Sequence, residues 1–379
     1  MGRDRGRTVV GGAAGAVAVL LLTAGCSSSG GDAGRAPAPP SSSAPPAASS
    51  SAAASPGAPR VAGVLTEDLK SPWGLAELPG GDLLVSSRDE RTVTRVDART
   101  GRKTALGVVP GVAPGGEGGL LGLAVRDGWV YAYLTSATDN RIVRMRYEGG
   151  PGDRLGAPEP VLAGIPKGVI HNGGRIAFGP DGMLYAGTGE TGRTGLAQDR
   201  GSLGGKVLRM TPEGRPAPGN PFPGSVVYSY GHRNVQGLAW DPAGRLWASE
   251  FGQNTWDELN LVEPGKNYGW PVVEGRAGRS GYTDPVAQWR TADASPSGIA
   301  YARGAVWMAG LRGERLWRIP LSGAERSGEP EAFLTGEYGR LRTVLATGGG
   351  TRLWLVTSET DTRGTPGPGD DKILRLEVG

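Results

Sequence analysis

The sequence predicts an all-β protein, a six-bladed β-propeller built from four-stranded antiparallel blades. Two observations carry this prediction. The same unit recurs six times along the chain. It consists of an apolar run with an alanine, a glycine-rich turn, a second apolar run, a polar loop and a third run. Its alanines are spaced 48, 53, 62, 61 and 46 residues apart, and periods of this length are typical of propeller blades. A β-sandwich, the alternative all-β architecture, has no such long internal period.

Each unit begins with a predicted hairpin. Its first strand contains one of six alanines: Ala76, Ala124, Ala177, Ala239, Ala300 and Ala346. A turn with glycine follows, because tight hairpins need residues that tolerate positive φ. These turns lie at 79–82, 126–128, 179–182, 241–244, 302–304 and 348–350. The second strands are rich in aromatic and β-branched residues, which favour strands. They are expected at 83–87, 129–135, 183–189, 245–250, 306–311 and 352–358.

The third strand of each unit alternates apolar with polar residues, so one face is expected in the core and the other in solvent. These strands are TVTRV (92–96), RIVRMR (141–146), KVLRM (206–210), ELNLV (258–262), RLWRI (315–319) and KILRL (372–376). A fourth, outer strand is less legible in every unit. Residues 61–65 are apolar apart from one glycine and are expected to supply the outer strand of the last blade, which would close the ring.

The first 25 residues are predicted to be a signal peptide of the lipoprotein type. Three arginines precede an apolar run from residue 9 to residue 22, and this run is too short to span a bilayer comfortably. Cys26, the only cysteine, follows two small residues. Its lipidation would anchor the mature protein to the outer face of the cell membrane; the alternative is a cleaved secretory peptide and a secreted protein.

Residues 26–60 are almost entirely Ser, Ala, Gly and Pro, a composition that cannot form a core and is typical of a tether. Residues 61–379 are expected to form the propeller, which carries the candidate site. The net charge is +4, of which +2 comes from three arginines and one aspartate within the predicted signal. No basic tract interleaved with aromatic residues is present, so nucleic acid is not an expected partner. A single cysteine excludes an internal disulfide.

Antiparallel pairing sorts the loops of the predicted blades into two faces. The loop that enters a first strand and the loop that leaves a second strand emerge on the same face. Unusual polar residues in these loops are therefore expected at one mouth of the propeller. They are Glu117, His171, Glu190, His232, Arg233, Asn234, Gln253, Ser295, Ser297, Arg312, Arg340 and Arg342.

Both histidines of the chain precede first strands at this mouth. A histidine is the usual general base for taking a proton from a hydroxyl group. His171 is the better candidate, because the Asn-Gly-Gly that follows it leaves space for a substrate. His232 is expected to hydrogen-bond a loop.

Four of the arginines at the mouth suit an anionic ligand, since their forked donors bind carboxylate or phosphate groups bidentately; the alternative is a solubilising rim. They are Arg233, Arg312, Arg340 and Arg342. The stretch 252–268 combines carbonyls near Gly252 with acidic side chains, the oxygen ligands that suit Ca²⁺, although such side chains can also simply face solvent. No zinc or nucleotide motif is present.

Several long motifs, in order, resemble the quinoprotein glucose/sorbosone dehydrogenase family. They are EGGLLGLA (117–124), HNGGRIAFGPDGMLYAGTGE (171–190), SLGGKVLRM (202–210), GNPFP (219–223), YGHRNVQGLAWDP (230–242), DELNLVEPGKNYGWP (257–271) and GRLRTVLA (339–346). The resemblance covers essentially all of the predicted propeller. It implies a dehydrogenase that uses pyrroloquinoline quinone (PQQ) and calcium to oxidise the anomeric carbon of aldose sugars to lactones, with hydride transfer to the quinone. The electron acceptor is not implied.

The resemblance also implies roles for the residues at matching positions. His171 matches the base that takes the proton from the anomeric hydroxyl as hydride passes to the quinone C5. Arg233 matches the arginine beside the reactive quinone carbonyls, and Asn234 matches a neighbouring cofactor contact. Arg340 and Arg342 match the pair that grips the PQQ carboxylates.

The metal ligands follow from the same resemblance. Gly252 and Gln253 occupy the positions whose backbone carbonyls hold the active-site calcium, and that ion would polarise the quinone as a Lewis acid. Glu258 and Tyr268 match contributors to a second, structural calcium.

Four positions depart from the glucose dehydrogenases. Arg312 stands where they carry Lys, and Gln253 stands where they carry Pro. Glu117, a further candidate for cofactor binding, stands where they carry Gln. Ile170 replaces an Asp that could orient or bias the base. These departures place the chain nearer the broader aldose dehydrogenases.

Two other functions are compatible with a propeller, because a fold does not determine a function. The first is a non-catalytic surface propeller that binds carbohydrate or a protein. The second is a calcium-dependent lactone hydrolase, although a neutral lactone would not need four arginines.

Overall fold

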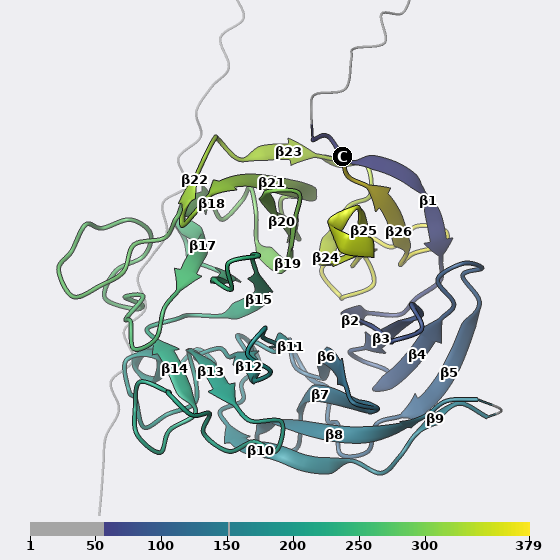
Figure 1. Cartoon of the computed structure of the whole chain (residues 1–379), viewed down its shortest axis with the longest axis horizontal. Coiled ribbons are helices and arrows are strands. Elements are labelled where there is room, and N and C mark those ends of the chain that lie inside the picture. The colour runs from purple at the N-terminus through teal and green to yellow at the C-terminus, as the bar shows by residue number, and fades with distance from the viewer. Residues whose placement is uncertain (1–56, 151) are drawn as a thin grey trace, which may run out of the picture. The chain divides into compact units, whose positions relative to one another are not determined.

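The computed structural model describes residues 57–150 and 152–379, in which six antiparallel sheets surround a central axis (Figure 1). The predicted signal peptide, Cys26 and most of the tether lie outside the described residues. The innermost strands are β2 (Pro72–Glu77), β6 (Leu120–Arg126), β11 (Ile176–Phe178), β15 (Val235–Trp240), β19 (Pro296–Ala302) and β24 (Leu341–Thr347). Each contains one of the six predicted alanines, so the predicted six-bladed propeller is confirmed.

The second and third strands follow the predicted runs closely. The second strands are β3 (Leu83–Ser87), β7 (Trp129–Thr135), β12 (Leu184–Gly187), β16 (Leu246–Glu250), β20 (Ala305–Gly310) and β25 (Arg352–Thr357). The third strands are β4 (Thr92–Val96), β8 (Asn140–Glu148), β13 (Lys206–Met210), β17 (Trp256–Val262), β21 (Arg315–Ser322) and β26 (Ile373–Glu377). One predicted hairpin turn differs: between β24 and β25 the chain forms the short 3₁₀ helix η2 (Gly348–Gly350).

The outer strands complete the blades. They are β5 (Lys103–Val108), β10 (Glu159–Ile165), β14 (Val227–Tyr230), β18 (Ala287–Arg290), β23 (Glu331–Phe333) and β1 (Arg60–Thr66). Strand β1 pairs antiparallel with β26, so the N-terminal strand closes the ring as predicted. Short additions are β9 (Arg154–Leu155), β22 (Glu325–Arg326) and the 3₁₀ helix η1 (Thr194–Ala197). Most positions of β5, β10 and β23 are exposed or half-buried, and this blurs the alternation that would reveal them.

Small residues let the innermost strands of neighbouring blades pack closely around the axis. A Cβ atom on Gly74 would lie 2.5 Å from the carbonyl oxygen of Leu121 in the next blade. The same crowding recurs at Gly237, whose Cβ would lie 2.5 Å from the oxygen of Ser297. Hydrogen bonds also join blades, since the Ser86 hydroxyl donates to the Leu121 carbonyl at 2.6 Å. The inner ends of the loops are therefore held rigidly at the mouth.

The apolar core lies between the blades. Three tryptophans of the second strands, Trp247, Trp307 and Trp354, are buried in three different clusters of apolar side chains. Large buried aromatic side chains contribute strongly to packing. Within the part of the chain that the structure describes, no helix is long and apolar enough to cross a membrane.

Candidate active site

A cavity of about 290 Å³ opens at the mouth where the polar loops were predicted to converge. Nine of the predicted site residues line it: Glu117, His171, Arg233, Asn234, Gly252, Gln253, Arg312, Arg340 and Arg342. They come from loops that enter first strands or leave second strands, or, for Arg342, from the start of β24. Counting strand directions therefore predicted the correct face. Glu258 and Tyr268 do not line this cavity.

The backbone of His171 is held in an unusual conformation at the edge of the cavity. Its φ of 54° lies in the left-handed region, which a residue with a side chain adopts only when its surroundings hold it there. The Glu117 carboxylate accepts the N–H of His171 at 2.8 Å, and the carbonyl of His171 accepts the N–H of Thr191 at 3.2 Å. A Cβ atom at Gly189 would lie 1.9 Å from that carbonyl oxygen, so only glycine fits there.

The imidazole of His171 is oriented by a buried carboxylate, Glu190, which the sequence placed at this mouth without assigning it a role. Glu190 Oε1 lies 2.5 Å from Nδ1 of His171, and Glu190 is 1% exposed. A carboxylate that accepts a hydrogen bond from Nδ1–H leaves Nε2 as the nitrogen able to take a proton. Glu190 lies in the loop that leaves β12, the strand paired with the one that His171 precedes, and this position had already placed it at the mouth.

His232 holds a loop, as expected. It is fully buried, its Nε2 lies 2.8 Å from the Ser229 hydroxyl, and its Nδ1 lies 3.0 Å from Glu250 Oε1. The other oxygen of Glu250 accepts the backbone N–H of Arg233 at 2.9 Å. Asn234 is 2% exposed and accepts the N–H of Gly173 at 2.9 Å, which ties it to the His171 loop. Arg233 and Asn234 are thus placed by buried neighbours.

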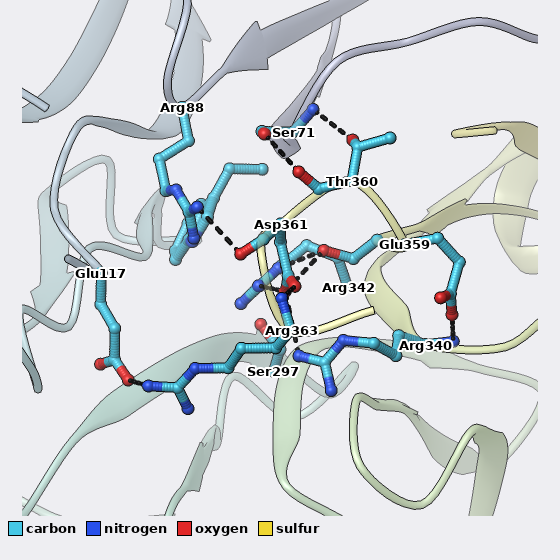
Figure 2. A network of polar contacts seen from close by, with 12 residues as sticks. Ser71, Arg88, Glu117, Ser297, Arg340, Arg342, Glu359, Thr360, Asp361 and Arg363 are labelled. Carbon is cyan, nitrogen blue, oxygen red and sulfur yellow. Dashed lines mark hydrogen bonds and ion pairs between the residues drawn. The ribbon is translucent and has the colours of Figure 1, made fainter. Parts of the chain in front are cut away.

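Arg340 and Arg342 converge on Asp361, a residue that the sequence did not single out (Figure 2). Asp361 Oδ2 accepts hydrogen bonds from Arg340 at 3.0 Å and from Arg342 at 2.7 Å. Burial by itself would raise the pKa of Asp361, but the two guanidinium groups outweigh it and lower that pKa to about 2. Figure 2 also shows Arg363 paired with Glu117, at 2.7 Å. The carboxylate of Glu117 therefore engages two protein groups, Arg363 and the backbone of His171.

The cavity is strongly cationic. Six arginines line it: Arg88, Arg233, Arg312, Arg340, Arg342 and Arg363. Three carboxylates face them: Glu117, Asp257 and Asp361. Six positive charges less three negative charges leave +3 on the lining side chains; Asp89, outside the lining, pairs with one of them, Arg88, at 2.8 Å. The Nε groups of Arg233 and Arg340 are buried without any hydrogen-bond partner among the described residues, and an unsatisfied buried donor is costly unless a ligand accepts from it.

The floor of the cavity adds a buried cation. Trp73 is 2% exposed, and its ring lies under the guanidinium of Arg175, 4.4 Å away. Arg175 donates to the Gln236 carbonyl at 2.8 Å and to the Thr343 hydroxyl at 3.0 Å, and no carboxylate pairs with it in the described part of the chain. Burial lowers its pKa to about 9, so the group stays charged at neutral pH. The sequence reasoning had missed Arg175.

Two backbone carbonyls at the cavity wall are free to bind a cation. Gly252 and Gln253 line the cavity, and neither carbonyl accepts a hydrogen bond from the described residues. Asp257 Oδ1 accepts the N–H of Gly252 at 2.9 Å, and Oδ2 accepts the N–H of Ser295 at 2.6 Å. Burial raises the pKa of Asp257 to about 6. The carbonyl oxygens of Gly252 and Gln253 are hard ligands of the type that Ca²⁺ prefers.

Glu258 and Tyr268 lie elsewhere, beside a hollow of about 10 Å³. Burial, together with the neighbouring Glu250, raises the pKa of Glu258 to about 8. The Tyr268 hydroxyl donates to the Leu261 carbonyl at 2.6 Å and accepts the N–H of Glu263 at 2.9 Å, so its hydroxyl is already engaged within the protein. Across residues 57–150 and 152–379, no group of three or more His, Cys, Asp or Glu side chains is arranged to hold a metal.

Comparison with known proteins identifies the family. The model of the glucose/sorbosone dehydrogenase family matches residues 69–366. The structure of the PQQ-bound aldose sugar dehydrogenase of Streptomyces coelicolor is 71% identical, covers 85% of this chain and 98% of that chain, and has a TM-score of 0.83.

Two curated relatives agree with this match. The quinoprotein glucose dehydrogenase B of Acinetobacter calcoaceticus is 32% identical over 64% of this chain and 59% of that protein, so the chain spans less than two thirds of it. The aldose sugar dehydrogenase YliI of Escherichia coli is 30% identical over 65% of this chain and 71% of that protein. The resemblance seen in the motifs is confirmed: this chain belongs to the glucose/sorbosone dehydrogenase family.

Proposed function

We propose that this protein is a PQQ- and calcium-dependent sugar dehydrogenase that oxidises the anomeric carbon of aldoses to lactones. The observation that carries the proposal is the charge of the cavity. Six arginines against three carboxylates leave a net charge of +3, and PQQ carries three carboxylates. Forked guanidinium donors bind such groups bidentately. A neutral ligand would leave this charge uncompensated.

The unpaired donors of the cavity support the same ligand. The buried Nε groups of Arg233 and Arg340 lack acceptors among the described residues. A flat ring with carbonyl and carboxylate oxygens at its edge would satisfy both of them. Trp73, an aromatic residue, also lines the cavity. The residues present therefore fit PQQ, and they would hold it through Arg233, Arg340 and Arg342, with Arg312 and Asn234 as further contacts.

Calcium is proposed at the free carbonyls of Gly252 and Gln253. When bound, PQQ would supply a quinone that accepts a hydride from the sugar, and Ca²⁺ would polarise that quinone as a Lewis acid. The second, structural calcium is proposed at Glu258 and the backbone oxygen of Tyr268. A cation there would relieve the charge repulsion between Glu258 and Glu250, which helps to raise the pKa of Glu258.

His171 is proposed to take the proton from the anomeric hydroxyl. Its Nε2 is the free ring nitrogen when Nδ1–H is donated to Glu190. The buried carboxylate would then stabilise the imidazolium that forms as the proton arrives. Glu117 would hold the base through its backbone N–H and so act beside the cofactor site. His171 would thus act as a general base whose ring is oriented by another side chain, that of Glu190.

The location and the electron acceptor extend the proposal. Export with a lipid at Cys26, or secretion without it, follows from the predicted signal peptide, and the tether at residues 26–60 would separate the propeller from the membrane. The predicted signal peptide, Cys26 and most of the tether lie outside the described residues. The acceptor is proposed to be an extracytoplasmic electron carrier.

The decisive experiment is a titration of the purified apoprotein with PQQ, with and without Ca²⁺. We expect a shift of the PQQ absorbance on binding, tighter binding with Ca²⁺, and reduction of an artificial dye acceptor when aldoses are added. The variant H171Q should still bind PQQ but lose turnover. PQQ that binds but supports no turnover with any aldose would refute the dehydrogenase. No binding of PQQ at all would favour a non-catalytic propeller.

A further inference from the structure

We propose that Glu274 orients the carbonyl groups of Gly252 and Gln253 toward the cavity and thereby sets the affinity of this site for calcium. The inference rests on the proposed function, because it takes these two carbonyls as calcium ligands. Glu274 belongs to the long loop between β17 and β18 and does not line the cavity. Toward this site it is therefore a positioning residue and not a ligand; its other neighbour is the small hollow beside Glu258 and Tyr268, which it lines.

One oxygen of Glu274 collects four consecutive backbone N–H groups. Oε1 accepts from Gln253 at 2.8 Å, Asn254 at 3.3 Å, Thr255 at 3.1 Å and Trp256 at 3.1 Å. Successive N–H groups that face one point form an anion-binding concavity. Here a carboxylate of the same chain, more than fifteen residues further along the sequence, occupies that concavity. The path of the loop between β16 and β17 is thus determined by a side chain from another loop.

These hydrogen bonds determine the direction in which the neighbouring carbonyl groups point, because the peptide unit is planar. In a planar trans peptide, the C=O of one residue and the N–H of the next point in opposite directions. The N–H groups of Gln253 and Asn254 point at Glu274. The carbonyls of Gly252 and Gln253 must therefore point away from Glu274. Because both residues line the cavity and neither carbonyl is otherwise bonded within the described residues, these oxygens are available to a cation there.

Glycine at position 252 makes this arrangement possible. A Cβ atom there would lie 1.9 Å from the Trp256 carbonyl oxygen and 2.6 Å from Glu274 Oε1. Asp257 holds the N–H of Gly252 from another side. The loop is thus restrained by two carboxylates before any ion arrives. A pre-organised set of oxygens binds a cation more tightly than a set that must be ordered on binding, and the negative charge behind the carbonyls adds attraction.

The test uses E274Q, which keeps an acceptor oxygen but removes the charge, with D284N as the matched control. Asp284 lies in the same loop and also caps backbone N–H groups, those of Ala277 and Gly278. Those residues do not line the cavity. Calcium affinity is measured by titration calorimetry on metal-stripped protein with and without saturating PQQ. The binding event that PQQ strengthens is assigned to the carbonyls of Gly252 and Gln253, which separates it from calcium at Glu258 and Tyr268, where Glu274 also lies. We expect E274Q to bind calcium about 10- to 100-fold more weakly, and D284N to bind it like the unmodified protein.

A second readout separates positioning from a purely structural role. Loss of stability alone would lower the unfolding temperature equally with and without calcium. Loss of positioning would shrink the rise in that temperature on adding calcium, because a ligand stabilises only as far as it binds. E274D, which keeps the charge but shortens the side chain, is the second variant if E274Q does not fold, and should also bind calcium more weakly.

The outcomes are distinguishable. If the unmodified protein binds calcium and folded E274Q or E274D binds it equally well, the role of Glu274 is refuted and the proposed function stands. If the unmodified protein binds PQQ but no calcium at this site, the calcium part of the proposed function fails, and the role of Glu274 fails with it.

Discussion

Replacement of Glu190 by Gln tests how the base is prepared for catalysis. The carboxylate is 1% exposed and lies 2.5 Å from Nδ1 of His171. A hydrogen bond to a charged group is worth about 1.5–3 kcal/mol. If that energy is expressed as the positive charge develops on the imidazole, its loss corresponds to a decrease in kcat of about 10- to 150-fold, at about 1.4 kcal/mol per factor of ten.

The assay is dye reduction by PQQ-saturated protein with a saturating aldose, combined with a PQQ titration. E190Q should lower kcat and leave PQQ affinity unchanged, because Glu190 does not line the cavity. The matched control is D241N, which alters another buried carboxylate at a turn between β15 and β16, on the opposite face. D241N should reduce stability but not kcat. A kcat for E190Q within threefold of the unmodified enzyme would refute the reasoning.

Three further predictions follow from the same cavity. Arg312 is exposed and forms no ion pair within the described residues, so R312A should weaken PQQ binding about tenfold in a titration without changing the unfolding temperature of the apoprotein; unchanged affinity would exclude Arg312 as a contact. A Cβ at Gly189 would displace the His171 carbonyl, so G189A should reduce turnover far more than PQQ affinity, and full activity would contradict this. Because the folded-state pKa of Asp361 lies at about 2, below its ordinary 3.8, its contribution of about 2 kcal/mol is present above pH 4 and lost as pH falls toward 2. The difference between D361N and the unmodified protein in urea unfolding should shrink over that range, and a difference independent of pH would contradict the assignment.

Sequence by itself determined the number of blades and the face on which the site lies. The spacing of the repeats indicates the number of blades, because every blade must fill the same wedge around the axis. Strand direction indicates the face on which each loop emerges, because antiparallel neighbours alternate in direction whatever their side chains contact. His171 and the arginines could therefore be brought to one mouth from their positions alone. The outer strands could not be located well, since their exposed faces carry little hydrophobic pattern.

Only the tertiary structure decided how the predicted residues are supported. Position had placed Glu190 at the mouth without a partner, and Asp361 and Glu274 had not been singled out; each contacts a group that the folded loops bring near. Such contacts depend on the course of each loop and on burial, which periodicity does not report. Glu258 and Tyr268, which the resemblance assigns to a second calcium, lie beside a separate small hollow. The repeat thus determined where the polar residues converge, and loop packing determined which carboxylates lie against them.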